Sequence, residues 1–185
     1  MFKTPFVIAD TEFTSWEGAM ARGWSGENEY KEIVQIAAIK VDPRQNFKEI
    51  EMFDVLVQPQ INPELSDYFI NLTHLTQEQV NQQGVLFSEA LKKFQAFTKK
   101  CPVWSYGQDD DVLRENCSLY GLPMLTLQFS DVRDVVKEHG FNPSNYTSGT
   151  LHQAFDIKMT GHVHNALHDC RSIAAFLAYT QKKSK

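Results

Sequence analysis

The sequence has few cysteines and no long apolar segment. Its three cysteines, Cys101, Cys117 and Cys170, are an odd number without C-x-x-C spacing, so they indicate neither a disulfide framework nor a thiolate zinc site. The N-terminus lacks the basic segment, apolar run and cleavage site of a signal peptide, and no apolar run is long enough to cross a membrane. We therefore expect a cytoplasmic protein without membrane association, whose thiols are buried or idle.

Basic residues are also scarce. The 18 Lys and Arg residues stand against 23 Asp and Glu residues, which gives a net charge of −5. This balance argues against a protein that holds nucleic acid on a large basic surface, but two bound divalent cations would offset the charge of four carboxylates in one pocket. No repeat, low-complexity block or flexible linker divides the chain, so we expect a single domain over residues 1–185.

The apolar pattern predicts strands first, and then strands that alternate with helices. Strands are expected at residues 6–10, 32–41, 49–57, 103–106 and 128–131, and helices at 66–72, 76–80, 87–99, 109–121, 131–139, 150–155 and 165–180. This order predicts an α/β fold with a mixed sheet flanked by helices. The aperiodic segment Ser15–Tyr30 is expected to be a loop, in which Trp16 and Trp24 could either stack on bases or pin the loop to the body.

Two acids lie at the end of the first predicted strand. Asp10 and Glu12 are two residues apart, so their side chains project from the same face, with α-carbons about 6.6 Å apart. This spacing lets both carboxylates reach one metal ion. Taken alone, the triplet is explained more simply as the polar end of a strand.

Two further groups stand at the starts of predicted helices. Asp109, Asp110 and Asp111 follow a glycine turn, where capping and the helix dipole favour one or two acids without any catalytic role. His164 precedes the last helix, and Asp169 lies at the edge of the apolar stripe of that helix, where a carboxylate needs a partner. A single histidine before a helix is more often a capping or surface residue than a catalyst.

Two other metal motifs are considered and rejected. His162-Val163-His164 is similar to the H-x-H motif of amidohydrolases, but that motif ends the first strand of a barrel of roughly 250 residues. The spacing of His164 and His168 is similar to the H-E-x-x-H motif of zinc proteases, but Asn165 stands where the general-base Glu belongs.

In combination, the acidic and histidine groups resemble the motifs of DnaQ-like exonucleases of the DEDDh subclass. The matching segments are Asp10-Thr11-Glu12, Gly107-Gln108-Asp109-Asp110, and His164 with Asp169. Residues 32–39 and 72–80 resemble the Eri and KapD-type branch, which includes exoribonucleases, although His74 stands where that branch usually has glycine. The resemblance covers essentially the whole chain and implies a ribonuclease H-like mixed five-stranded sheet.

The resemblance also implies a function and a set of site residues. It implies a metal-dependent 3′–5′ exonuclease that releases nucleoside 5′-monophosphates from the 3′ end of single-stranded RNA or DNA, with RNA slightly favoured. Two Mg²⁺ or Mn²⁺ ions would be held by Asp10, Glu12, Asp110 and Asp169, and His164 would be the general base, because an ordinary histidine pKa near 6.5 suits that role. Substitutions of His162 and His168 are expected to have mild effects.

The central carboxylate has two candidates. A helical wheel places Asp109 in the middle of the apolar face, whereas motif spacing from Gly107 selects Asp110. We predict Asp110 as the metal ligand and Asp109 as the N-cap of the helix.

Two alternative functions remain. The first is a catalytically idle nucleic-acid-binding adaptor, which the complete set of site residues disfavours. The second is a proofreading exonuclease bound to a polymerase. Only Gln181–Lys185 follows the last predicted helix, which favours a free enzyme.

Overall fold

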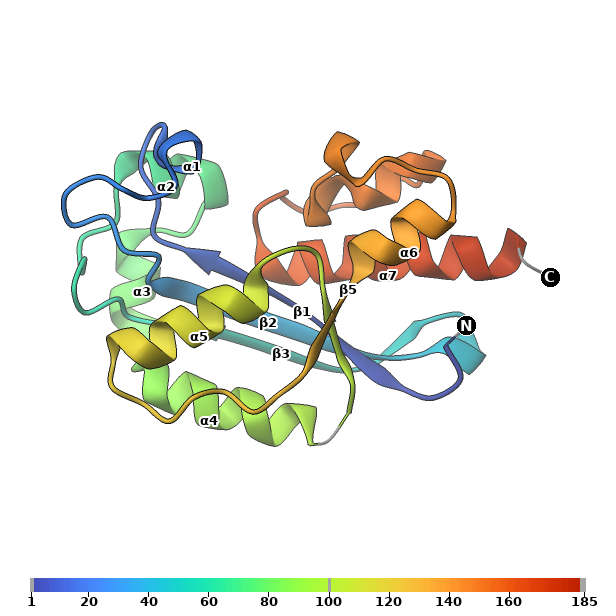
Figure 1. The fold of residues 1–185 in the computed structure, drawn as a ribbon, viewed down its shortest axis with the longest axis horizontal. Coiled ribbons are helices and arrows are strands. Elements are labelled where there is room, and N and C mark those ends of the chain that lie inside the picture. Colours follow the sequence, from blue (N-terminus) through green and yellow to red (C-terminus); the bar gives the residue numbers. More distant parts are fainter. Residues whose placement is uncertain (1, 100, 184–185) are drawn as a thin grey trace.

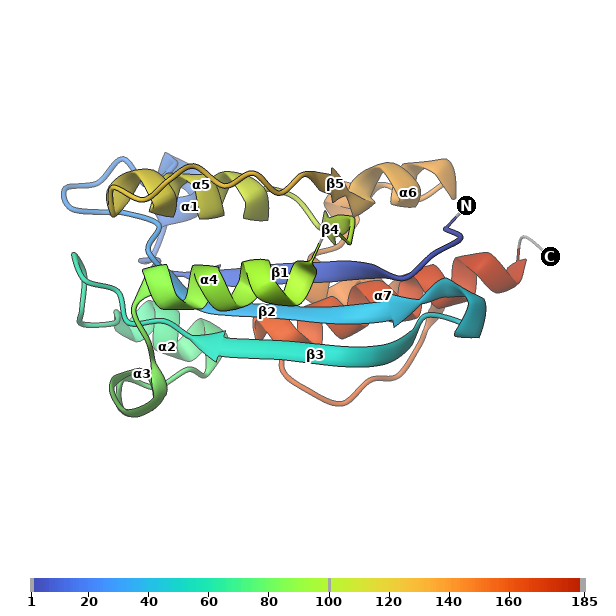
Figure 2. The same ribbon diagram turned by 90° about the horizontal axis from the view of Figure 1, so that it is seen from below.

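The computed structural model describes residues 2–99 and 101–183, so the last two residues of the Gln181–Lys185 segment lie outside the described part. The strands form one five-stranded sheet in the order β3-β2-β1-β4-β5 (Figure 1). The first three strands are an antiparallel meander (Figure 2), and β4 and β5 continue the sheet in parallel with β1. The strands are β1 (Phe6–Phe13), β2 (Ile33–Asp42), β3 (Lys48–Leu56), β4 (Val103–Ser105) and β5 (Phe129–Asp131). The predicted mixed sheet flanked by helices is confirmed.

Helices cover both faces of the sheet (Figure 1). On one face, α4 (Phe87–Thr98) packs against β2 and β3, and α5 (Asp109–Leu119) packs against β1 and β2. On the other face, α7 (Ala166–Lys183) packs against β1, β2 and the 3₁₀ helix η3 (Ser148–Phe155). The remaining elements are α1 (Ala19–Arg22), η1 (Pro43–Gln45), α2 (Asp67–Thr73), α3 (Gln77–Gln83), α6 (Val132–Glu138) and η2 (Pro143–Asn145).

The central strand β1 separates two apolar cores. Val7 and Ala9 belong to the core beneath α4 and α5, and Phe6 and Ile8 belong to the core beneath α6 and α7. Because side chains alternate along a strand, the end of β1 continues both faces. Its last acids therefore lie on the α7 face, and Thr11 lies on the α5 face.

The segment Ser15–Tyr30 differs from the predicted loop because it contains the short helix α1. Gly18 and Gly23 bracket this helix with φ angles of 74° and 64°, a conformation that glycine adopts readily. The indole N–H of Trp24 donates to the carbonyl of Thr14 at 3.0 Å. This bond supports the interpretation that Trp24 pins the segment to the body; base stacking by Trp16 and Trp24 stays a prediction.

A buried carboxylate fixes the chain that leads to α2. Glu32 is fully buried and accepts the backbone N–H groups of Gln60, Ile61 and Asn62. The hydroxyl of Tyr120 donates to the same carboxylate. Hydrogen bonds to a buried charge are stronger than those between neutral groups, so the approach to α2 is tied firmly to the start of β2.

All three cysteines are free; Cys117 and Cys170 are buried and Cys101 is partly buried, as predicted. Among the described residues, no helix is both long and apolar enough to pass through a lipid bilayer. The single domain over residues 1–185 and the cytoplasmic location stay predictions.

Candidate active site

A cleft of about 560 Å³ opens where β1 ends, and three of the four predicted metal-binding acids lie in it together with Asp109. Its lining includes four carboxylates and two basic side chains, Lys31 and Arg133. A larger cavity of about 780 Å³ lies between β5, α6 and α7 and shares no lining residue with the cleft. The four carboxylates and the histidine of the cleft are Asp10, Glu12, Asp109, Asp169 and His164.

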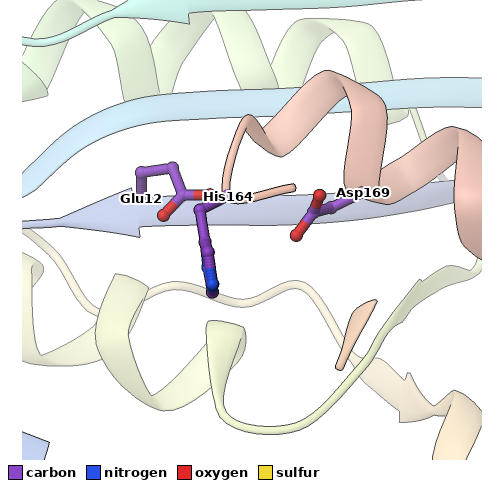
Figure 3. A group of neighbouring side chains, drawn as sticks. All are labelled: Glu12, His164 and Asp169. Carbon is purple, nitrogen blue, oxygen red and sulfur yellow. The ribbon is translucent and has the colours of Figure 1, made fainter. Parts of the chain in front are cut away.

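Three of these side chains form a compact group. One potential ligand atom from each of Glu12, His164 and Asp169 lies within 4.8 Å of the other two. Figure 3 shows them together beside β1 and the beginning of α7. His164 is held in a turn that closes with a 3.2 Å bond from the N–H of Asn165 to the carbonyl of His162, and it has a left-handed φ of 68°.

The structure places Asp109, and not Asp110, in the cleft. Asp109 is buried, and its Oδ1 accepts the backbone N–H of Thr11 at 3.0 Å and the Thr11 hydroxyl at 2.8 Å. Asp110 is partly exposed and does not line the cleft. The predicted placement of Asp110 is therefore wrong, and so is the predicted N-cap, because Gln108 holds that position.

Helical periodicity explains the position of Asp109. The helix starts at Asp109, so this residue shares a face with the buried Val112 and Leu113, three and four positions later. In its first turn that face extends past the apolar layer and reaches the polar end of β1. The carboxylate consequently meets Thr11 instead of a hydrocarbon core.

The two oxygens of the Asp169 carboxylate differ in their hydrogen bonding. Its Oδ2 accepts the hydroxyl of Ser148 at 2.9 Å, whereas its buried Oδ1 has no hydrogen-bond partner among the described residues. Gly149 passes so close that a Cβ there would lie 2.4 Å from Oδ1. A side chain at position 149 would displace the Asp169 carboxylate, and the buried Oδ1 is left without a donor or a cation in the described part of the chain.

Burial and mutual repulsion shift the pKa values of the cluster. Burial, followed by the neighbouring carboxylates, raises the pKa of Asp10 and of Glu12 well above the ordinary values. Burial also raises the pKa of Asp109 to about 6 and that of Asp169 to about 7. For His164, burial and then the nearby His162 lower the pKa, which favours the neutral imidazole.

The donor set suits a hard divalent cation. Carboxylate oxygens are the ligands that Mg²⁺ and Mn²⁺ prefer, and the unpartnered Oδ1 of Asp169 lacks only a positive partner. Cys170 lies nearby, but burial and then the acidic neighbours raise its pKa, so its thiol stays protonated and is a poor ligand. The site thus has the character of an acidic metal site without soft ligands.

The fold and this acidic site define the class of the protein. The fold is that of the ribonuclease H-like exonucleases, as the similar solved structures below show. The family model described as an exonuclease, RNase T, matches residues 7–177, and the chain belongs to this DEDDh RNase T/DnaQ-like 3′–5′ exonuclease family, whose members are typically metal-dependent. No curated protein matches the sequence significantly.

Similar solved structures support the fold. The nuclease domain of 3′hExo, a DEDDh family member bound to rAMP, superposes with a TM-score of 0.83 at 21% identity, over 98% of this chain and 94% of that chain. A 3′-exonuclease structure on recognition of histone mRNA stem-loop gives 0.83 at 21% identity, over 99% and 84%. Escherichia coli ExoI in complex with ssDNA gives 0.68 at 18% identity, over 98% and 42%. At these low sequence identities, the structural similarity shows a shared fold and nothing more.

Sequence reasoning did not identify every residue that shapes the cleft. Thr11 and Ser148, which orient Asp109 and Asp169, carry no sequence signal beyond their polarity. Met20 and Tyr68 line the cleft with exposed side chains. An exposed apolar residue in an aperiodic segment is the weak signal that could have indicated Met20.

We predict that the metal-free protein becomes less stable as the pH rises from 5 to 8. The pKa of Asp109 is raised to about 6 and that of Asp169 to about 7, so each carboxyl binds its proton more tightly when folded. Its contribution to stability is complete at acidic pH and is lost as pH rises through these values. The lowered pKa values of His152 and His164 act in the opposite direction, but these are two groups against the four carboxyls of the cleft.

Thermal melting in a chelator, followed across this pH range, measures the effect. Added Mn²⁺ or Mg²⁺ should remove the fall and raise the melting temperature at pH 8, because the ions bind only the folded, ionised cluster. A metal-free melting temperature that rises from pH 5 to pH 8 would contradict the prediction.

Proposed function

We propose that this protein is a metal-dependent 3′–5′ exonuclease that removes nucleoside 5′-monophosphates from single-stranded nucleic acid, with RNA preferred over DNA. The observation that carries the proposal is the cleft in which Asp10, Glu12, Asp109 and Asp169 meet with His164. Such a concentration of buried carboxylates is unfavourable without cations. In a chain that belongs to an exonuclease family, such a cluster indicates a site that works with metal bound.

The side chains of the cleft would have different roles in metal binding, in orientation of the carboxylates and in attraction of phosphate. The four carboxylates would hold two Mg²⁺ or Mn²⁺ ions, which in such sites lower the pKa of water and neutralise charge on the phosphodiester. Thr11 and Ser148 orient two of the carboxylates through the bonds described above. Lys31 and Arg133 on the cleft wall favour an approaching phosphate.

His164 would act as the general base. Its lowered pKa keeps the imidazole neutral and able to accept a proton. In the reaction, the oxygen of one water bonds to phosphorus, the bond from phosphorus to the 3′ oxygen breaks, and the water proton passes to His164. The 3′ oxygen takes up a proton from solvent as it leaves, and His164 later releases its proton to solvent. The products are a nucleoside 5′-monophosphate and a shortened chain with a free 3′ hydroxyl.

The preference for single strands and for RNA has two supports. Aromatic side chains on the cleft wall, Phe13, Trp24 and Tyr68, offer surfaces on which unpaired bases can stack. The segments that resemble the Eri and KapD-type branch favour RNA. The similar structures described with rAMP and histone mRNA stem-loop agree with this preference, whereas the ExoI structure contains ssDNA.

Matched RNA and DNA oligomers labelled at the 5′ end test the proposal. With Mg²⁺ or Mn²⁺ we expect a ladder of labelled products that shorten by one nucleotide, with RNA degraded faster, and no products after exhaustive chelation. Label released as a mononucleotide, internal cuts only, or full activity in chelator would contradict it. Protein with His164→Ala, purified in parallel, controls for contaminating nucleases.

A further inference from the structure

The loop that carries His164 is joined to the end of α2 by two other histidines. The rings of His74 and His162 are stacked, with centroids 3.6 Å apart and planes 10° apart. Nε2 of His162 lies 2.8 Å from the carbonyl oxygen of Leu72. Leu72 is in the last turn of α2, where helix carbonyls lack partners inside the helix, so an imidazole N–H is a favourable donor there. We call this pair, His74 and His162, the histidine clasp.

The backbone of His74 is unfavourable for a residue with a side chain. His74 ends α2 with φ 61° and ψ 12°, a left-handed conformation that is unfavourable for a non-glycine residue. Glycine would adopt it freely. The histidine side chain points its ring onto His162, and this contact offsets the conformational cost.

The histidine clasp bears directly on the position of His164. His162 is the first residue of the turn that Asn165 closes, and His164 is the third. On the other side of the same loop, Gly161 is packed so tightly on His168 that a Cβ would lie 2.3 Å from its Nδ1. The turn is therefore held from two sides, and a shift of His162 would shift His164.

The histidine clasp also joins two walls of the cleft. Leu72 and Phe69 of α2 line the cleft opposite the end of β1, and His164 lines it from the loop before α7. Figures 1 and 2 show α2 beside the segment that leads into α7. The wall that would contact nucleotides and the proposed general base are thus one connected unit.

We propose that His74 and His162 are positioning residues that hold His164 at the angle needed for proton transfer. This inference rests on the proposed exonuclease function. It also revises the expectation that substitution of His162 is mild. His162 is near enough to Asp169 to act on that carboxyl electrostatically, but among the described residues no hydrogen bond joins the histidine clasp to a carboxylate of the cleft. We therefore expect its main effect on the catalytic step and little effect on metal binding.

Three variants separate the parts of the histidine clasp. His74→Gly removes the stacked ring and relieves the backbone, His162→Gln keeps a donor for the Leu72 carbonyl without the ring, and His162→Phe keeps a ring without the donor. Asn46→Gly is the matched control, since Asn46 has a left-handed φ of 56° in the turn between β2 and β3, away from the cleft. Each of the three should lower kcat by about 10-fold or more, the effect expected from a misplaced catalytic group.

His74→Gly gives the sharpest result. We expect its melting temperature to stay level or rise, because glycine suits this backbone, while its kcat falls and its metal-induced stabilisation is kept. Asn46→Gly should keep wild-type kcat. If His74→Gly only weakened the fold, its melting temperature and kcat would fall together, and kcat would return to the wild-type value in assays well below the melting temperature. Such a recovery of kcat would overturn the proposal.

Hydrogen exchange tests the histidine clasp without any activity. The amide of Asn165, which closes the turn, should exchange faster in His74→Gly and His162→Gln than in the wild type, and unchanged exchange with unchanged kcat would overturn the proposal. An inactive wild type would reject the proposed function, while the exchange rates would still decide whether the histidine clasp holds the turn.

Discussion

Asp109→Asn is expected to reduce turnover by roughly 10³-fold, whereas Asp110→Asn should leave it within a few-fold of wild type. The side chain of Asp109 lies in the cleft and that of Asp110 does not. Asparagine keeps an acceptor for Thr11 but removes the negative charge that a cation needs. Turnover of a labelled oligomer at saturating Mg²⁺ measures both variants.

The stability of the same variant should change in the opposite direction. Asp109 raises the pKa of Asp10 and of Glu12 through charge repulsion, so its neutralisation relieves the metal-free cluster. Asp109→Asn should therefore melt at a higher temperature than wild type in chelator at pH 8. If Asp110→Asn were the inactive variant, the central ligand would have to be reassigned despite the placement of Asp109.

His164→Ala should lower kcat by roughly 10² to 10⁴, the usual share of a positioned general base. We expect the chemical step to slow while metal binding is kept, because the four carboxylates remain. We therefore expect the variant to keep the Mn²⁺-induced rise in melting temperature, which Asp169→Asn should lose. His139→Ala, a change at an exposed histidine outside the cleft, controls for loss of a histidine in general. Near-normal turnover by His164→Ala would exclude it as the base.

Much of the fold can be predicted from the sequence because its strongest signals are local. Residues 6–9 of β1 and residues 36–39 of β2 are buried on both faces of the sheet, so each stretch is a continuous apolar run. Helix α1 could not be predicted in this way, because a single turn is too short to show a helical period. Two glycines define its ends. The helix expected at residues 150–155 is present as the 3₁₀ helix η3, whose period of three residues differs from that of an α-helix.

The residues of the site could be predicted wherever motif spacing and helical or strand periodicity select the same residue. Asp10, Glu12, His164 and Asp169 meet in the cleft as predicted, although their roles in metal binding and proton transfer stay predictions. At Asp109 the two arguments disagreed, and the geometry of the first helical turn decides between them. The histidine clasp could not be predicted, since it depends on a contact between His74 and His162, which lie far apart in the sequence.

The cleft draws its acids from β1, α5 and α7, and two of these elements, β1 and α7, are the first strand and the last helix of the fold. During synthesis on the ribosome, the chain therefore displays Asp10 and Glu12 long before the helix that carries Asp169 exists. Contacts between such distant segments form late in folding, because loop closure must come first. A nascent or partly folded chain would have no assembled metal site, so nuclease activity would begin only once the final helix has docked on the sheet.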